Sequence, residues 1–227
     1  GRSAHLLPHG VDLDFWREPP LGAPISGIAG LERPLIVFWG VIDPRMDAAF
    51  VQRLAAELTS GTIVLAGPEA DPDPAVISCR RVVRLGALPF AQLPRLGRAA
   101  DVIIMPYIDQ PVTRAMQPLK LKEYLATGKP VVVRDLPATR SWADCLDLAD
   151  TPEAFVRAVQ LRLMMGLPPS QEKARMRLAG EGWAEKARIF ERWVLEKEIA
   201  SPNDAIPPFV NHSLPSRVHP STGEYPG

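Results

Sequence analysis

Cysteine and histidine are scarce in this sequence of 227 residues, which contains two cysteines and four histidines. Cys79 and Cys145 stand without a second cysteine or a histidine at a metal-binding spacing, so the pair suits a reducing compartment. The histidines are scattered along the chain: His5, His9, His212 and His219. A metal cluster built from these residues is therefore not expected.

The sequence also lacks a long apolar run, a signal peptide and an excess of one charge. No segment approaches the roughly 18 apolar residues of a membrane-spanning helix, and no basic start leads into an apolar core. The 26 basic and 26 acidic residues balance, which argues against a nucleic-acid-binding protein that relies on a broad basic surface. A hydrophobic fraction of 46% supplies a large core and excludes disorder of the whole chain.

Proline, by contrast, is abundant: the 25 prolines are about twice the ordinary share of roughly 5%. Six of them fall in the last 27 residues, Ser201–Gly227, which carry no periodic apolar pattern. We expect this Pro-rich tail to be mobile. A second irregular segment, rich in glycine and proline, spans residues 16–34.

Between these segments, apolar runs alternate with amphipathic stretches. The short apolar runs predict strands at Leu35–Trp39, Thr62–Ala66, Val82–Leu85, Asp101–Met105 and Pro130–Val133. Apolar residues at helical spacing predict helices at Asp47–Leu58, Gln92–Ala100, Leu119–Thr127, Pro152–Met165 and Gln171–Glu198. Buried strands that are each followed by a helix predict an α/β fold, a Rossmann-like, doubly wound parallel sheet. In such sheets ligands bind outside the carboxyl ends of the strands, which makes the loops there the candidate site.

The loop after Met105 leads into a helix that is predicted to begin at Pro118. Proline is favourable in a first helical turn because its missing N–H would have no partner there, and Gly128 and Pro130 end the helix. The amino end of this helix lies on the ligand side of the predicted sheet. Its free amides and its positive dipole end favour an anion, most naturally a phosphate.

Lys120 and Glu123 lie one turn apart on this helix and therefore on one face. In a binding site, the ammonium group can reach a phosphate while the carboxylate accepts hydrogen bonds from two ribose hydroxyls. The alternative is an ordinary surface ion pair, worth roughly 0.2–0.5 kcal/mol, and the spacing alone favours this alternative. Leu119, Leu121 and Leu125 anchor the helix and thereby direct its polar face.

Other loop residues are compatible with a ligand without defining one. Arg45, between the first strand and its helix, can clamp a diphosphate or be a solvated loop arginine. Gly40 and Gly67, at strand ends, allow a close backbone approach to a ligand or are turn glycines. The glycine motifs of dinucleotide-binding and P-loop proteins are absent, and neither Ser26 nor Ser141 has the partners of a catalytic triad.

Five segments form an ordered series along the chain. They are HLLPHGVD (5–12), FWGVIDPRMD (38–47), TIVLAGPE (62–69), RLGALPFAQLPRLGRAADVIIMPY (84–107) and PLKLKEYLATGKPVVV (118–133). Together they resemble the GT-B glycosyltransferases of the broad group 1, family 4-like class. The first segment is similar to the junction between the two domains of that family, and the last to its nucleotide-sugar-binding segment.

The resemblance implies a carboxy-terminal, Rossmann-like domain that holds a nucleotide-diphosphate sugar. Glu123 matches the family glutamate that binds the ribose hydroxyls, while Leu119 and Lys120 match the helix start near the diphosphate. Further matches are Arg45 near the family's basic phosphate ligand, Gly67 after the second strand, and Leu88 where backbone groups meet the nucleobase. Gly40 belongs to the same candidate site.

Two departures from the family pattern concern the donor sugar. Many members carry a second glutamate in an E-x7-E arrangement, but Met116 stands near that position, seven residues before Glu123. The usual contact to the sugar is then absent, or is made by the backbone or by Gln117. The position after Gly40, often arginine in the family, is Val41. Sugar identity and the choice between retention and inversion stay open.

A third departure is length, because family members have two such domains and this sequence begins at the junction. We predict an interdomain junction segment at 1–15, a nucleotide-sugar-binding domain at 16–200 and the Pro-rich tail at 201–227. The acceptor-binding, amino-terminal half is absent from the sequence. We therefore expect the chain alone to bind a donor without transferring its sugar, and no catalytic residue is assigned.

The function that the resemblance implies is sugar transfer to a saccharide or lipid acceptor in bacterial polysaccharide or glycolipid synthesis. The expected partners are a nucleotide-diphosphate sugar and the absent acceptor domain, with no nucleic acid. No metal or other cofactor is expected, because a helix dipole with Lys120 and Arg45 can stabilise the leaving diphosphate. The expected location is the cytoplasm, at the inner face of the membrane if the absent half associates with it. The alternatives are a non-catalytic nucleotide-binding or partner-docking module and a GT-B-type nucleotide-sugar epimerase.

The Pro-rich tail is expected to be dispensable for folding. It has too few periodic apolar residues to offset an ordering entropy of roughly 1–2 kcal/mol per residue. Truncation after Ala200 should leave the melting temperature, measured by circular dichroism, within a few degrees of that of the full chain. A large drop would show that Phe209 or Tyr225 packs on the core.

Overall fold

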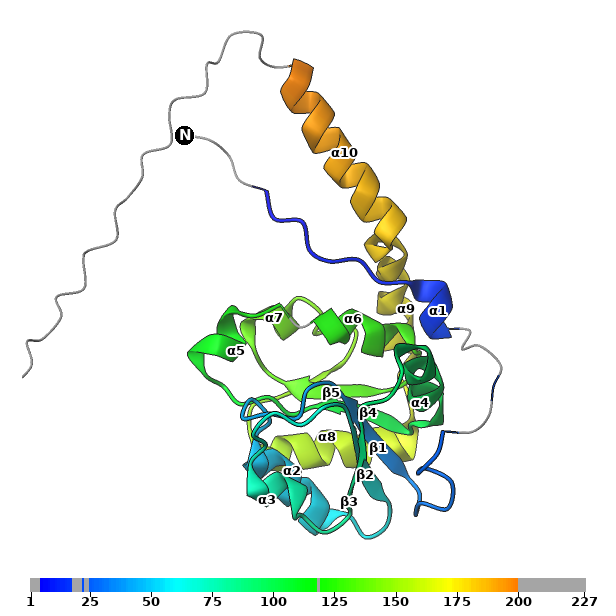
Figure 1. Cartoon of the computed structure of the whole chain (residues 1–227), viewed down its shortest axis with the longest axis vertical. Coiled ribbons are helices and arrows are strands. Elements are labelled where there is room, and N and C mark those ends of the chain that lie inside the picture. Colours follow the sequence, from blue (N-terminus) through cyan, green and yellow to red (C-terminus); the bar gives the residue numbers. More distant parts are fainter. Residues whose placement is uncertain (1–4, 18–21, 23–24, 118, 200–227) are drawn as a thin grey trace, which may run out of the picture. The chain divides into compact units, whose positions relative to one another are not determined.

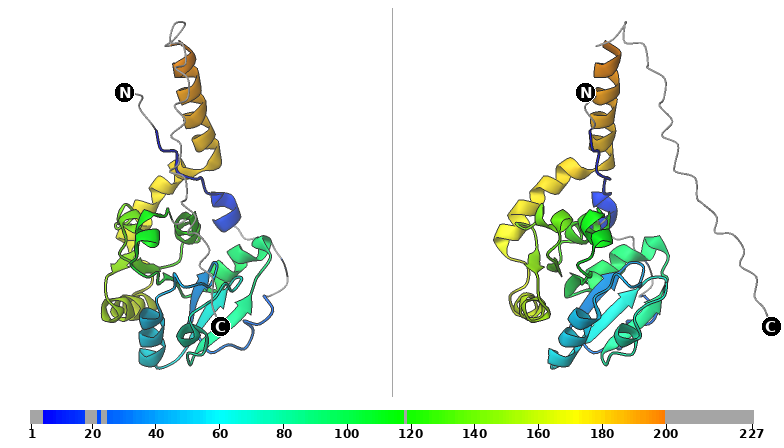
Figure 2. Two further views of the ribbon diagram at one scale, coloured as in Figure 1. Left: turned by 60° about the vertical axis from the view of Figure 1, so that its left-hand side comes forward. Right: turned by 90° about the vertical axis from the view of Figure 1, so that its left-hand side faces the viewer.

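The computed structural model of the chain describes residues 5–17, 22, 25–117 and 119–199. It divides into two compact units, Gly1–Phe190 and Glu191–Gly227. The first unit holds the whole sheet and its flanking helices (Figures 1 and 2). The described residues of the second unit, 191–199, are helical. The predicted tail at 201–227 and the predicted helix start at Pro118 lie outside the described residues.

The first unit is built on a parallel sheet of six strands. They are β1 (Leu35–Trp39), β2 (Thr62–Ala66), β3 (Val82–Gly86), β4 (Val102–Met105), β5 (Val131–Arg134) and β6 (Asp147–Ala149). Their order is β3-β2-β1-β4-β5-β6, and every pair is parallel. The direction of strand order reverses between β1 and β4, so the crevice at their carboxyl ends is the expected place for a ligand. The predicted Rossmann-like fold class is confirmed.

Helices cover both faces of this sheet (Figure 1). One face carries α2 (Ala48–Glu57), α3 (Pro74–Ile77) and α8 (Pro152–Met165), and the other carries α1 (Leu13–Arg17), α4 (Leu93–Ala99) and α6 (Leu119–Ala126). The remaining helical elements are α5 (Pro111–Ala115), α7 (Pro137–Arg140), α9 (Pro169–Ala174), α10 (Trp183–Ile199) and the 3₁₀ turns η1 (Phe90–Gln92) and η2 (Arg175–Glu181). Because helices lie on both sides, the central strands β1, β2 and β4 are buried along their whole length.

Local sequence signals set the ends of several elements. Asp47 caps α2 by accepting a hydrogen bond from the backbone N–H of Ala49, and Thr151 caps α8 in the same way. Continuous apolar runs predicted β1 and β2 to the residue, and the amphipathic pattern did so for α8. It missed the short edge strand β6, which is too brief to show a period, and the one-turn helices.

The predicted single helix Gln171–Glu198 is wrong. The structure has three pieces here: η2 follows α9 directly, and Gly182 separates η2 from α10. Gly182 adopts an extended conformation that ends η2, and it pairs with Val11 in a short parallel bridge. A contact to a segment about 170 residues away in the sequence therefore interrupts the helical pattern.

Helix α1 connects the predicted junction segment to the core. The boundary predicted between residues 15 and 16 falls within this helix, whose Trp16 is buried with 3% of its surface exposed. Gly10, ahead of it, packs against the ring of Trp183 so closely that a methyl group would lie 2.7 Å from it. The junction segment is thus packed into the same unit as the sheet.

The loops after β4 and β5 share one pattern, DQPVTR (109–114) and DLPATR (135–140), and one structure. In each, a fully buried threonine hydroxyl accepts a hydrogen bond from the backbone N–H three residues earlier, at 3.0 Å for Thr113 and 2.9 Å for Thr139. In each, the arginine that ends the pattern pairs with the aspartate that opens it. Two neighbouring strands therefore lead into equivalent short helices, α5 and α7, which contact each other.

Gly67 is fixed by the close approach of two strand ends. A Cβ atom at Gly67 would lie 1.7 Å from the carbonyl oxygen of Gly40, and the φ of Gly67 is +152°. The carbonyl of Gly40 belongs to the backbone, which cannot move aside as easily as a flexible side chain. Only glycine fits this position.

Gly67→Ala is therefore expected to destabilise the protein by about 2–4 kcal/mol through steric overlap and backbone strain. Gly180→Ala is the matched control, because no atom lies within 4 Å of its added methyl group. Urea unfolding of both variants measures the difference. Equal stability of the two variants would contradict the crowding at Gly67.

Candidate functional site

A hollow of about 140 Å³ lies at the carboxyl ends of β1, β2 and β3. Its lining comes from the three strand ends and from α6: Trp39, Gly40, Val41, Ala66, Gly67, Pro68, Ala87, Leu88, Leu93 and Lys120. Four residues that the sequence singled out, Gly40, Gly67, Leu88 and Lys120, thus meet at one place. We call this space the strand-end hollow.

Glycines let the backbone form the floor of the strand-end hollow. Gly40 donates a hydrogen bond to the carbonyl of Ala66 at 2.9 Å, and Gly67 donates one to the carbonyl of Gly86 at 2.8 Å. These bonds continue the sheet one residue beyond β1 and β2. Beyond these glycines the two loops stay paired, because Ile42 donates to the carbonyl of Pro68 at 2.9 Å and Ala70 donates to that of Ile42 at 3.0 Å. Since neither glycine has a side chain, a ligand can approach the backbone there.

Lys120 crosses this floor from α6. Its Cε and Cδ atoms lie 3.1 and 3.3 Å from the position of a Cβ at Gly40, so its stem covers that glycine. Within the described ranges, Lys120 forms no ion pair within 4 Å. The alternative of a surface ion pair with Glu123 is therefore not realised, and the two residues interact only through the field of their charges.

Glu123 lies beside the hollow and is held by Trp39. The indole Nε1–H of Trp39 donates to Oε2 of Glu123 at 3.3 Å. Burial raises the pKa of Glu123 above its usual value, while the charge of Lys120 and the hydrogen bond from Trp39 act in the opposite direction. Trp39 is one functional residue that the sequence reasoning missed, because it was assigned only to the core of a strand.

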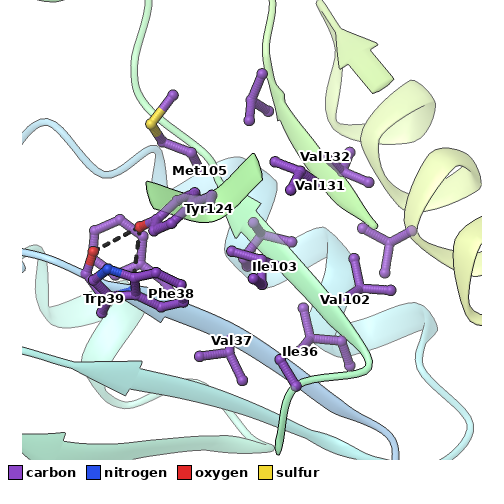
Figure 3. Close-up of a cluster of buried hydrophobic side chains, with 14 of the residues drawn as sticks. Ile36, Val37, Phe38, Trp39, Val102, Ile103, Met105, Tyr124, Val131 and Val132 are labelled. Carbon is purple, nitrogen blue, oxygen red and sulfur yellow. Dashed lines mark hydrogen bonds between the residues drawn. The ribbon is translucent and has the colours of Figure 1, made fainter. Parts of the chain in front are cut away.

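Tyr124 fixes α6 on the end of β1 (Figure 3). Its hydroxyl donates to the carbonyl of Trp39 at 2.6 Å and accepts from the backbone N–H of Trp39 at 3.3 Å. The side chain is fully buried, and burial raises the pKa of the phenol well above its ordinary value. The helix face that carries Lys120 and Glu123 is thereby fixed in rotation relative to the strand.

Arg45 is not part of the strand-end hollow. Its Nε donates to Asp43 at 2.9 and 3.0 Å and its Nη2 at 2.5 Å, and the guanidinium lies 5.8 Å from the ring centre of Tyr107. Its side chain remains 35% exposed. Arg45, the side chain that the sequence predicts to bind a phosphate, is thus held by Asp43 two residues earlier.

The remaining predicted residues are spread around the start of α6. Leu119 is 58% exposed, and Met116 packs against the core. The residue eight positions before Glu123 is Ala115, the last of α5, so neither of the two positions near a family-type second glutamate carries a carboxylate. Gln117 lines a different and larger hollow of about 380 Å³ on another face of α6.

That larger hollow contains polar residues that the sequence analysis did not assign. Its lining is Pro8, His9, Gln117, Leu121, Lys122, Ala138, Ser141, Trp142, Arg177 and Glu181. Arg177 lies 4.4 Å over the ring of Trp142 and pairs with Asp144 at 2.6 Å. Only one predicted site residue is present here, whereas four line the strand-end hollow.

A buried charge cluster of Lys122, Glu181 and Lys186 lies beside the larger hollow. The carboxylate of Glu181 accepts from the ammonium groups of Lys122 and, at 2.7 Å, of Lys186. Lys122 also donates to the carbonyl of His9 at 2.8 Å. The cluster therefore joins the junction segment, α6, η2 and α10 in one place.

The residues that the structure describes contain neither a group of metal ligands nor a membrane-spanning helix. Within that part of the chain, no three histidine, cysteine or acidic side chains come together as metal ligands. None of its helices combines the length and the apolar character that crossing a membrane requires.

The fold and this site define a Rossmann-like domain with a hollow at the carboxyl ends of its strands, next to the topological switch point between β1 and β4. The family model "Glycosyl transferases group 1" matches residues 33–165. The chain therefore belongs to the group 1 glycosyl transferase family. It is 30% identical over 141 residues to TuaH of Bacillus subtilis (strain 168), whose name describes it as a teichuronic acid biosynthesis glycosyltransferase.

Solved structures with the same fold include a sucrose-phosphate synthase from Thermosynechococcus elongatus (TM-score 0.65, 18% identity, 87% of this chain, 53% of that one). An alpha,alpha-trehalose-phosphate synthase (UDP-forming) from Burkholderia vietnamiensis matches with TM-score 0.65, 15% identity, 86% of this chain and 53% of that one. The alignment with TuaH covers 60% of this chain and 35% of TuaH. The chain thus spans about a third to half of these relatives.

The charge cluster makes a testable contribution to stability. Glu181→Gln is expected to cost about 3–5 kcal/mol at pH 7, because it leaves two buried ammonium groups without a carboxylate. Burial alone would raise the pKa of Glu181, but the hydrogen bonds from Lys122 and Lys186 outweigh it and the pKa is lowered. The contribution is therefore present above the unfolded-state pKa and is lost as the pH falls through the lower, folded-state pKa.

Urea unfolding as a function of pH measures this effect. The stabilities of the wild type and the variant should converge only when the pH falls below the lowered, folded-state pKa of Glu181. The control is Glu185→Gln, which removes the partner of an arginine that is 70% exposed and should change stability by less than about 0.5 kcal/mol. A Glu181 variant as stable as this control would exclude the cluster as an anchor.

Proposed function

We propose that this chain is the nucleotide-sugar-binding part of a glycosyltransferase that transfers a sugar to a saccharide or lipid acceptor. The observation that carries the proposal is the convergence of Gly40, Gly67, Leu88 and Lys120 around the strand-end hollow, with Glu123 beside it. These positions come from four separate segments of the sequence. Family membership supports the same conclusion.

In this proposal the nucleoside occupies the strand-end hollow. The nucleobase faces Leu88, the ribose hydroxyls donate to Glu123, and the diphosphate lies between Gly40 and the start of α6. Lys120, whose stem already covers Gly40, supplies a positive charge there. The larger hollow is the less suitable place, because the cations of its charge cluster are already neutralised by Glu181.

The proposed reaction is displacement at the anomeric carbon. An acceptor hydroxyl forms the new bond to that carbon and loses its proton, while the bond to the diphosphate oxygen breaks and its electron pair leaves with the nucleoside diphosphate. Lys120 and the amides at the start of α6 stabilise the negative charge that develops on the leaving group. We propose that this stabilisation replaces a divalent metal.

Arg45 is assigned a secondary role in this proposal. Its Nε and Nη2 already bind Asp43, so a phosphate would have to use Nη1 or displace the aspartate. Asp43 keeps the guanidinium close to the crevice between β1 and β4, near Tyr107. A phosphate that extends past Gly40 would meet it there.

The acceptor and its domain are proposed as partners of this chain. Family members are longer than the matched region, and the chain spans 35% of TuaH. The free Cys79 and Cys145 agree with a reducing compartment, so we propose a cytoplasmic location. An association with the inner face of the membrane through the acceptor half belongs to the same proposal.

One observation favours a second candidate, a non-catalytic nucleotide-binding module. Ala115 and Met116 offer no side-chain hydrogen-bond acceptor where many family members contact the donor sugar. Such a module would bind the nucleoside diphosphate as tightly as the nucleotide sugar. The ratio of these two affinities separates the two candidates.

Nucleoside diphosphate is expected to bind without a metal, and UDP is the first probe because one structural relative is named UDP-forming. Glu123→Ala should weaken binding by about 1–3 kcal/mol, as charge-assisted hydrogen bonds are lost. Isothermal calorimetry with and without a chelator measures both. Glu153→Ala, an exposed substitution on the opposite face of the sheet, is the control.

Two outcomes would contradict this proposal. Loss of binding in chelator would show that a metal holds the diphosphate. An effect of Glu123→Ala as small as that of the control would exclude the contact to the ribose. ADP and GDP, tested beside UDP, identify the base.

A further inference from the structure

Trp39 ends β1 within a group of stacked aromatic rings. Its side chain is fully buried, lies parallel to the ring of Trp16 at 5.5 Å and 11°, and meets Tyr124 edge to face at 4.3 Å. Trp16 belongs to α1, which precedes the region that the family model matches. The orientation of the Trp39 indole is thus set from two sides.

The edge of this indole faces the carboxylate of Glu123. Within the described part of the chain, Trp39 is the one group that donates a hydrogen bond to that carboxylate, over 3.3 Å, slightly longer than a typical N–H···O bond. An indole has one hydrogen-bond donor and no acceptor, so its N–H can bind a carboxylate and the ring accepts no other hydrogen bond. The other carboxylate oxygen stays available for a ligand.

We propose that Trp39 is a positioning residue for the ribose, that it orients the Glu123 carboxylate through its Nε1–H, and that Trp16 holds its ring in place. This inference rests on the proposed function, because it assigns the ribose to Glu123. It adds a contribution from α1 to the nucleotide site. The site then extends beyond the segment that the family model covers.

The physical reason is the freedom of a glutamate side chain. Glu123 has three rotatable bonds, and a carboxylate that receives two neighbouring hydroxyls must stand in one orientation. A rigid donor fixes this orientation before the ligand binds, and the rotamer entropy is then lost on folding, not on binding. Lys120, the nearby cation, attracts the carboxylate without fixing its direction.

Trp39→Phe tests the inference, because it keeps an aromatic ring and removes only the donor. The readout is the ratio of affinities for UDP and 2′-deoxy-UDP, in which contributions of the base and the diphosphate cancel. The wild type is expected to prefer the ribonucleotide by about tenfold, and Trp39→Phe by about threefold or less. Trp16→Leu removes the stacked ring but keeps an apolar side chain. Its ratio of affinities should lie between those of the wild type and of Trp39→Phe.

Trp142→Phe is the matched control. Trp142 lies in the larger hollow under Arg177, away from the strand-end hollow, and its substitution should leave the ratio unchanged. Melting temperatures establish that each variant is folded. A ratio that Trp39→Phe leaves at the wild-type value would overturn the inference while the proposed function stands.

A second measurement remains informative even if Trp39→Phe does not fold. The ¹H–¹⁵N signal of the Trp39 indole in the wild type should shift with pH as Glu123 titrates, with a midpoint above the ordinary glutamate range because burial raises the pKa of Glu123. Among the described residues, the charged and titratable neighbours of Glu123 are Lys120 and Tyr124, and burial raises the pKa of Tyr124 well above its ordinary value, so the phenol stays neutral while the carboxylate titrates. Glu123→Gln should abolish the shift.

The two readouts separate the possible failures. An indole signal that does not respond to pH, or that responds equally in Glu123→Gln, would overturn the inference without testing any nucleotide. A wild type that binds UDP and 2′-deoxy-UDP equally would overturn the ribose contact of the proposed function and, with it, the positioning role. A pH-dependent indole together with a reduced ratio in Trp39→Phe is the expected result.

Discussion

The docking of α6 onto the end of β1 is the contact on which the rest of the site depends. Tyr124 makes it by binding both the backbone N–H and the carbonyl of Trp39 inside the core, where an unpaired hydroxyl would be costly (Figure 3). Once that contact fixes the rotation of α6, Lys120 lies over Gly40 and Glu123 beside the indole of Trp39. The same helix then directs Lys122 to the opposite side.

Lys122 shows how a short helix can serve two purposes. Its buried ammonium group satisfies the carbonyl of His9 and the carboxylate of Glu181, which ties the junction segment and η2 to α6. Burying this charge is tolerable only because it is paired and hydrogen-bonded. The result is that the helix is held from three directions, by β1, by η2 and by the junction segment. In the proposed function, a helix start that is held in this way is preorganised for a phosphate.

The sequence predicted the fold better than the details of the site. Continuous apolar runs located the five longest strands, because strands buried on both faces need no particular period. The same pattern failed at η2, where the pairing of Val11 with Gly182 breaks a helical stretch. The stacking of Trp16 on Trp39 likewise joins residues far apart in the sequence, which no local pattern reveals. For the site, the loop positions converged as predicted at Gly40, Gly67, Leu88 and Lys120.

By itself, the sequence determined the parallel sheet, the direction of its strands and therefore the sheet edge to which the candidate site belongs. It determined these because hydrophobic patterning and strand handedness are local rules. The tertiary structure decided which partner each polar group received: Asp43 for Arg45, Trp39 for Glu123 and, among the residues that the structure describes, no ion-pair partner for Lys120. Spacing along a helix cannot distinguish a surface ion pair from two groups that face a hollow. The packing of α6 against β1 decides between these two arrangements, because it places the Glu123 carboxylate next to the indole N–H of Trp39.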